Sequence, residues 1–166
     1  DVSLLDDETP PSVEFALASS AGDEGTTSLL DLSLSGPVSV PVTIDLAYAG
    51  PASGGDATEP LSATFPAFST SAVVSIGLLV DGLHELPEDL VVTLVATDTA
   101  LPGLLAAHVL TINDLDPPPV LGFALASQEV VEGDLVLGAD VVLSVVSGRE
   151  TIVSYSVSAA SSADAG

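Results

Sequence analysis

The sequence repeats itself at a fixed offset of 108 residues. "FALASS" begins at Phe15 and "FALASQ" begins at Phe123, and 123 − 15 = 108. The same shift pairs three further stretches: 4–15 with 112–123, 24–25 with 132–133, and 52–57 with 160–165. Agreement of separate stretches at one offset indicates a tandem repeat rather than chance similarity in a Ser/Ala-rich chain.

The offset divides the chain into three parts. Residues 1–11 are expected to be the tail of a preceding repeat with its linker, 12–116 a complete repeat, and 117–166 a linker followed by the N-terminal half of a further repeat. The proline-rich stretches "TPPS" and "DPPP" lie at the two joints. Proline fixes φ and donates no backbone hydrogen bond, so it ends strands and stiffens short connections.

Within the complete repeat, apolar and polar residues alternate. "VPVTIDLAY" places Val42, Ile44 and Leu46 on one face, and the nearly continuous apolar runs "VVSIGLLV" and "LVVTLVA" suit a sandwich interior. About seven strands are predicted: 13–18, 28–34, 40–48, 62–68, 72–80, 90–96 and 106–112. Short strands of this number and spacing predict an all-β fold, an immunoglobulin-like antiparallel β-sandwich of Greek-key type.

The charge balance narrows the possible partners. The chain has 24 acidic residues and a single Lys or Arg, Arg149, which gives a formal net charge of −23. Phosphate contacts need Lys and Arg, so nucleic acid is excluded and anionic membranes are disfavoured. Cysteine is absent, which excludes disulfides and thiolate metal sites. No apolar run is long enough for membrane insertion.

Most carboxylates of the complete repeat fall in connections between the predicted strands. Successive connections of an antiparallel sandwich alternate between its two ends, so the first, third, fifth and final connections share one end. That parity is expected to bring together the carboxylates of these connections: Glu24, Asp56, Asp81, Glu85, Glu88, Asp114 and Asp116.

The electrostatic repulsion among these carboxylates has to be offset. Two unit charges 4 Å apart repel by roughly 4 kcal/mol at an effective dielectric constant of about 20. Either the pKa values rise or a cation neutralises the group. Oxygen-only ligands favour a hard cation, and Ca²⁺ suits an irregular cage of six to eight oxygens better than Mg²⁺ with its small octahedron.

The ordered motifs resemble the Calx-β domain. The stretches that carry the resemblance are "VEFALASSAGDEG", "VSVPVTIDLAYAGPASGGDA", "VVSIGLLVDGLHELPEDLVVTLV" and "HVLTINDLD", which together span 12–116. The resemblance continues into 119–166. It implies a calcium-binding sandwich with ligands at the seven carboxylates above and at the backbone carbonyl of Leu83.

Some positions depart from the family pattern. Val80 stands where the family often has an Asp, Leu115 interrupts the closing acidic triplet, and Ala57 replaces the usual aromatic residue. These departures imply fewer ions or weaker binding. The resemblance also places counterparts of ligand positions outside the complete repeat: Asp6, Asp7 and Glu8 before it, and Glu132 and Asp164 after it.

The sequence supports a structural role more strongly than a catalytic one. We expect a calcium-binding repeat of a large extracellular bacterial surface, matrix or filament protein, in which Ca²⁺ stiffens the joints between neighbouring repeats.

The alternatives are a solvated acidic loop, an interaction or self-association module that uses sheet edges with any metal incidental, and a cadherin-like repeat, which "INDLDPPP" suggests. No enzyme is expected, because no nucleophile elbow or phosphate loop is present. His84 is interpreted as an exposed loop residue and His108 as a strand residue.

Overall fold

The structure, a computed structural model, describes residues 9–129, 131 and 138–156. The ligand counterparts expected at Asp6, Asp7, Glu8, Glu132 and Asp164 lie outside the described residues. No helix occurs among the described residues, so none of them forms a helix that could cross a membrane.

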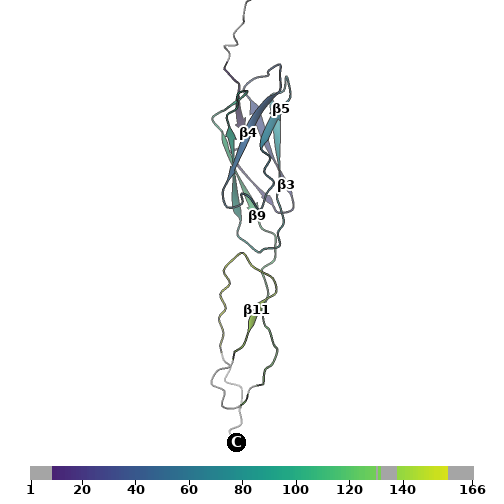
Figure 1. Ribbon diagram of the computed structural model, residues 1–166, viewed down its shortest axis with the longest axis vertical. Coiled ribbons are helices and arrows are strands. Elements are labelled where there is room, and N and C mark those ends of the chain that lie inside the picture. The colour runs from purple at the N-terminus through teal and green to yellow at the C-terminus, as the bar shows by residue number, and fades with distance from the viewer. Residues whose placement is uncertain (1–8, 130, 132–137, 157–166) are drawn as a thin grey trace, which may run out of the picture.

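Two sheets pack face to face in the complete repeat (Figure 1). One sheet has the strand order β6-β3-β1-β8 and the other the order β2-β9-β7-β4-β5. The expected all-β sandwich is therefore confirmed. The bounds are β1 Ser12–Phe15, β2 Ser19–Asp23, β3 Thr27–Leu34, β4 Val42–Ala49, β5 Ser62–Phe65, β6 Ser71–Gly77, β7 Glu88–Val95, β8 Leu101–Pro102 and β9 Ala107–Asn113.

The first predicted strand is in fact two strands that belong to different sheets. The Ala16 N–H donates to Asp31 O in the β3 sheet at 2.9 Å, whereas Ala18 O accepts from Val109 N–H in the β9 sheet at 2.9 Å. Between them the apolar alternation fails, because Leu17 is 63% exposed. The prediction of one continuous strand over 13–18 was wrong at this switch.

A buried histidine holds the switch in place. His108 lies in β9, as predicted, and is 2% exposed. Its Nδ1 lies 2.7 Å from Leu17 O and its Nε2 lies 2.8 Å from Ser20 Oγ. The ring therefore donates to the connection between β1 and β2 and accepts from the Ser20 hydroxyl, which fixes the path of β2 along β9.

The core lies between the two sheets and is built almost entirely from aliphatic side chains. Alternate residues of β4, β7 and β9 point inward, and Ile44, Leu90 and Leu110 are fully buried. Two of the four phenylalanines, Phe15 and Phe65, are also buried. The period-two pattern thus positions the strands, and the polar connections are left to the two ends of the sandwich.

Two short strands follow the sandwich. β10 (Leu121–Phe123) and β11 (Val141–Leu143) form an antiparallel pair of their own. Figure 1 shows this segment continuing the long axis of the molecule beyond the end of the sandwich where β9 finishes. The segment also touches that end directly, through a bridge between His84 and Ser147.

Candidate metal centre

Four connections meet at the end of the sandwich that faces the β10–β11 segment. They are the β2–β3 turn, the β4–β5 loop, the β6–β7 loop and the chain that follows β9. Carboxylates from all four connections line one small cavity, whose acidic residues are Glu24, Asp56, Glu85, Glu88 and Asp114. We call this end of the sandwich the acidic pole.

The carboxylates of the acidic pole form two groups. The inner cluster contains Glu24, Asp114 and Asp116, and the outer cluster contains Asp56, Asp81 and Glu85. Within each cluster, one oxygen of every residue lies within 4.8 Å of one oxygen of each of the others. The parity of the connections therefore brought together residues up to 92 positions apart, from Glu24 to Asp116 (116 − 24 = 92).

The inner cluster contains polar atoms without partners. Glu24 is only 9% exposed, and its Oε2 is buried without a hydrogen-bond partner. The Oδ2 of Asp116 is in the same situation. Leaving a buried acceptor unsatisfied costs about 1–3 kcal/mol, and more for a charged group. Glu24 and Asp116 both belong to the inner cluster, so a single cation bound there would contact both carboxylates.

The pKa of Glu24 is shifted by its burial and by the neighbouring carboxylates. Burial raises the pKa of its carboxyl above 4.5, and the nearby charges of Asp114, Asp116 and Asp81 raise it further, although a hydrogen bond from the Leu115 backbone opposes the shift. The carboxylate is therefore destabilised in its charged form, which is the form that binds metal.

The turn that presents Glu24 depends on the next residue. Gly25 has φ of 73°, a left-handed conformation that costs other residues energy. A Cβ at this position would lie 3.2 Å from Val80 Cγ2. The Glu-Gly dipeptide thus combines a carboxylate of the inner cluster with the residue type that makes this tight turn without strain.

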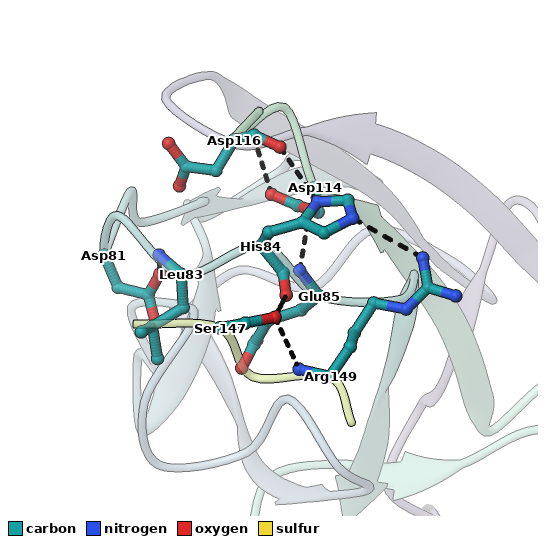
Figure 2. Close-up of polar contacts among 8 residues, drawn as sticks. All are labelled: Asp81, Leu83, His84, Glu85, Asp114, Asp116, Ser147 and Arg149. Atoms are coloured by element: carbon teal, nitrogen blue, oxygen red, sulfur yellow. Dashed lines mark hydrogen bonds and ion pairs between the residues drawn. The ribbon is translucent and has the colours of Figure 1, made fainter. Parts of the chain in front are cut away.

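His84 is part of the acidic pole, so its interpretation as an exposed loop residue was wrong. Its side chain is 20% exposed, and Nδ1 lies 3.0 Å from both Asp114 Oδ2 and the backbone oxygen of Asp116 (Figure 2). Strand alternation could not reveal this contact, because it depends on how the chain after β9 folds back over the β6–β7 loop.

Asp114 is the most strongly held carboxylate of the pole. Its Oδ2 accepts from Glu85 N–H at 2.8 Å and its Oδ1 accepts from Asp116 N–H at 2.7 Å. Burial alone would raise the pKa of Asp114, but these two backbone donors and His84 outweigh it and lower the pKa below 3.8. Asp114 therefore stays ionised and fixes the β6–β7 loop to the end of β9.

The outer cluster is more open. Asp81 is exposed, and its Oδ1 accepts from Leu83 N–H at 2.7 Å, which shapes the loop (Figure 2). Burial raises the pKa of Glu85, and the charges of Asp81, Glu88, Asp56 and Asp114 add to the increase. Within the outer cluster, the repulsion from neighbouring carboxylates thus acts on Glu85, whose backbone N–H donates to Asp114 of the inner cluster.

Two expected ligands lie outside both clusters. Glu88 begins β7 and lines the cavity, but it does not belong to either group of three. Leu83 lies in the β6–β7 loop and has no side-chain oxygen, so only its backbone carbonyl could bind an ion. The ligand roles of both residues stay predictions.

The three residues that depart from the Calx-β pattern, Ala57, Val80 and Leu115, differ in burial. Ala57 is 8% exposed and forms a bridge with Leu78, so a small side chain closes the β4–β5 loop against the end of β6. Val80 packs over Gly25 although it is 63% exposed, and Leu115 is 65% exposed between two acidic residues. Asp114 and Asp116, on either side of it, both belong to the inner cluster.

Comparison with known proteins identifies the fold. No family profile and no curated protein sequence matches the chain. The crystal structure of CBD12 from CALX1.2 matches with a TM-score of 0.56 and 15% identity, covering 73% of this chain and 52% of that one. The crystal structure of the calcium binding domain CBD12 of CALX1.1 matches with a TM-score of 0.56 and 17% identity, covering 74% and 53%.

The fold is Calx-β-like. This confirms the fold that the ordered motifs predicted. The chain spans about half the length of the two solved structures it matches. At 15–17% identity the likeness establishes the architecture, and the chemistry of the acidic pole must be argued from the residues of this chain.

Proposed function

We propose that the chain is a calcium-binding β-sandwich module and that the acidic pole is its binding site. One observation carries the proposal: Glu24 Oε2 and Asp116 Oδ2 are buried without partners in the same cluster. Among the described residues no Lys or Arg forms an ion pair with the carboxylates of this pole, and His84 is a positive partner of Asp114 only if it is protonated. A solvated acidic loop would not bury charged oxygens in this way.

The arrangement suits Ca²⁺. The inner cluster would hold one ion through Glu24, Asp114 and Asp116, and the outer cluster a second through Asp56, Asp81 and Glu85. The Leu83 carbonyl and Glu88 could complete the coordination, with water at the remaining positions. Ca²⁺ accepts six to eight oxygen ligands in irregular geometry, whereas Mg²⁺ requires a near-ideal octahedron.

The proposed biological role is structural and not enzymatic. We infer that the chain belongs to a large extracellular bacterial surface, matrix or filament protein, and that Ca²⁺ stiffens the joint to the following repeat. The supporting contact is that of Ser147 and Arg149 with His84, which itself contacts Asp114. An ion that fixes Asp114 and its neighbours would also fix the surface on which the next segment rests. CALX1.1 provides the parallel, since its solved structure is described as that of the calcium binding domain CBD12.

Calorimetric titration with Ca²⁺, combined with thermal unfolding, tests the proposal. Free Ca²⁺ at 100 times Kd would stabilise a one-site protein by about 2.7 kcal/mol, which corresponds to a rise in Tm of roughly 5–10 °C. Glu85→Ala should weaken binding, while Asp31→Asn, a change to an exposed carboxylate in the middle of β3, should not. Equal melting temperatures in EDTA and in millimolar Ca²⁺ would refute the proposal.

A further inference from the structure

The β4–β5 loop contains a second carboxylate besides the expected ligand Asp56. Glu59 follows Asp56 in the same loop and is partly buried, but it belongs to neither cluster of the acidic pole. Its Oε1 accepts two hydrogen bonds from within the loop, one from Ser53 Oγ at 2.9 Å and one from Gly54 N–H at 2.9 Å. These two hydrogen bonds, which we call the Glu59 clasp, tie the two sides of the loop together.

The chain that leads away from Asp56 is held against the end of β6. Asp56 O accepts from Leu79 N–H at 2.8 Å. Thr58 exchanges two hydrogen bonds with Gly77: Thr58 N–H donates to Gly77 O at 2.8 Å, and Thr58 Oγ1 accepts from Gly77 N–H at 2.7 Å. Residues 56–58 are therefore fixed by contacts in which the clasp takes no part.

The chain that leads into Asp56 depends on the clasp instead. Gly54 and Gly55 precede Asp56, and glycine has the greatest backbone freedom of all residues. Gly54 has φ of 90°, and among the described residues no backbone–backbone hydrogen bond holds either glycine. The Gly54 N–H is held by Glu59. The direction in which the chain enters Asp56 is thus fixed by a side chain.

Glu59 is anchored in turn to the sandwich. Tyr48 lies in β4, and its hydroxyl donates to the backbone oxygen of Pro60 at 2.7 Å, next to Glu59 in the chain. Burial raises the pKa of Tyr48 to about 12, and the nearby charge of Glu59 adds to the increase. The clasp is therefore connected to the sheet through Tyr48.

We propose that Glu59 is a positioning residue, which directs the Asp56 carboxylate toward Asp81 and Glu85 without binding an ion itself. One oxygen of each of these three carboxylates lies within 4.8 Å of one oxygen of each of the others. Like charges this close repel, so the loop has to hold Asp56 beside the other two in the metal-free chain. The effect of the clasp on calcium affinity rests on the function proposed above, whereas the clasp itself belongs to the metal-free loop.

Two substitutions of Glu59 separate the clasp from the charge. Glu59→Gln and Glu59→Ala both remove one negative charge, but glutamine keeps an Oε1 that can accept both hydrogen bonds, whereas alanine has no acceptor. Calorimetric titration of the whole 166-residue chain with Ca²⁺ should give a Kd roughly fivefold higher for Glu59→Ala than for Glu59→Gln. Equal Kd values for the two variants would overturn the proposal.

A substitution on the donor side tests the clasp at constant charge. Ser53→Ala removes one of the two donors and leaves the Gly54 N–H as the other. Its Kd for Ca²⁺ should rise by about twofold, less than the rise in Glu59→Ala. A Kd for Ser53→Ala above that of Glu59→Ala would contradict the proposal, because the loop would then depend on Ser53 for a reason other than the clasp.

Amide hydrogen exchange in EDTA tests the clasp without calcium. Measured by NMR, the Gly54 amide should exchange slowly in the unsubstituted chain and in Glu59→Gln, and about tenfold faster in Glu59→Ala. The Thr58 amide, which donates to Gly77 O, is the internal control and should change little. Rapid Gly54 exchange in the unsubstituted chain would overturn the proposal. The expected exchange pattern in a chain that binds no Ca²⁺ would refute the proposed function and still support the placement of Asp56 by Glu59.

Discussion

Burial and three neighbouring carboxylates act together on Glu24. Its pKa is raised by burial first and then by Asp114, Asp116 and Asp81. In the absence of metal this charge opposes folding, and at the proposed calcium site the same charge would bind the ion. A single substitution should therefore change the two properties in opposite directions.

Glu24→Gln should stabilise the metal-free chain and weaken calcium binding. The amide removes the buried charge but leaves the inner cluster one anionic ligand short, and we expect an affinity loss of tenfold or more, or about 1.4 kcal/mol. Urea unfolding in EDTA measures the first effect and calorimetric titration the second. Asp31→Asn is the control, since it removes a charge from an exposed position on β3. Unchanged affinity would remove Glu24 from the ligand set.

The stability of the metal-free chain should increase as the pH falls from neutral toward about 4.5. Glu24 and Glu85 have raised pKa values, so the folded state takes up protons at a higher pH than the unfolded state, and acidification favours folding until the unfolded carboxyls near 4.5 also titrate. Asp114 acts in the opposite direction: its lowered pKa stabilises the fold above pH 3.8, and that contribution is lost as the pH falls through its folded pKa.

Urea unfolding in EDTA across this pH range provides the measurement. General self-repulsion of a chain with net charge −23 also weakens with acid. The double variant Glu24→Gln, Glu85→Gln separates the two causes, because it should flatten the pH dependence while nearly all of the net charge remains. An equally steep dependence in the double variant would assign the effect to overall charge.

The sequence was most informative about residues whose position follows from strand parity. Counting connections predicted that Glu24, Asp56, Glu85 and Asp114 would lie at one end, and the structure places all four around one cavity. His84 was missed, because its contacts with Asp114 and Asp116 arise from loop geometry that has no period. A histidine between two candidate ligands, Asp81 and Glu85, was the available signal.

At the scale of elements, alternation predicted strands well wherever one face is buried. It failed at two kinds of place. The switch from β1 to β2 changes sheets within three residues, where hydrogen bonds to Asp31 and from Val109 decide the path and the alternation says nothing. β8 is two residues long and contains a proline, so it is too short to show any period.

The β2–β3 turn offers a test at this scale. Gly25→Ala should destabilise the sandwich by about 1–2 kcal/mol, because alanine is strained at φ of 73° and its Cβ would approach Val80. Gly36→Ala is the matched control: nothing lies within 4 Å of its added Cβ and its φ is not positive. Chemical denaturation measures both, and similar effects in the two variants would show that the turn geometry is not the cause.

At the scale of the whole molecule, the most unusual property is the strongly negative net charge of −23. Arg149 is the only Lys or Arg among 166 residues, and it lies beside the acidic pole although it belongs to the following segment. Its Nη1 is 3.5 Å from His84 Nε2, and it shares a hollow with Glu85 and Glu88. Gly148 next to it leaves room for the Glu85 side chain, which an added Cβ would meet.

This placement predicts that Arg149 opposes calcium binding. A fixed positive charge near the pole lowers the attraction for a divalent cation, so Arg149→Gln should increase calcium affinity roughly twofold to threefold at low ionic strength. Glu150→Gln, which removes a negative charge next to it, should weaken binding by a similar factor. Both changes in calcium affinity should become smaller in 1 M salt, where the screening length falls to about 3 Å. Calorimetric titration at two salt concentrations measures them. A loss of affinity in Arg149→Gln that persists in high salt would instead show that Arg149 acts by holding the joint between the segments in place, and not through its charge.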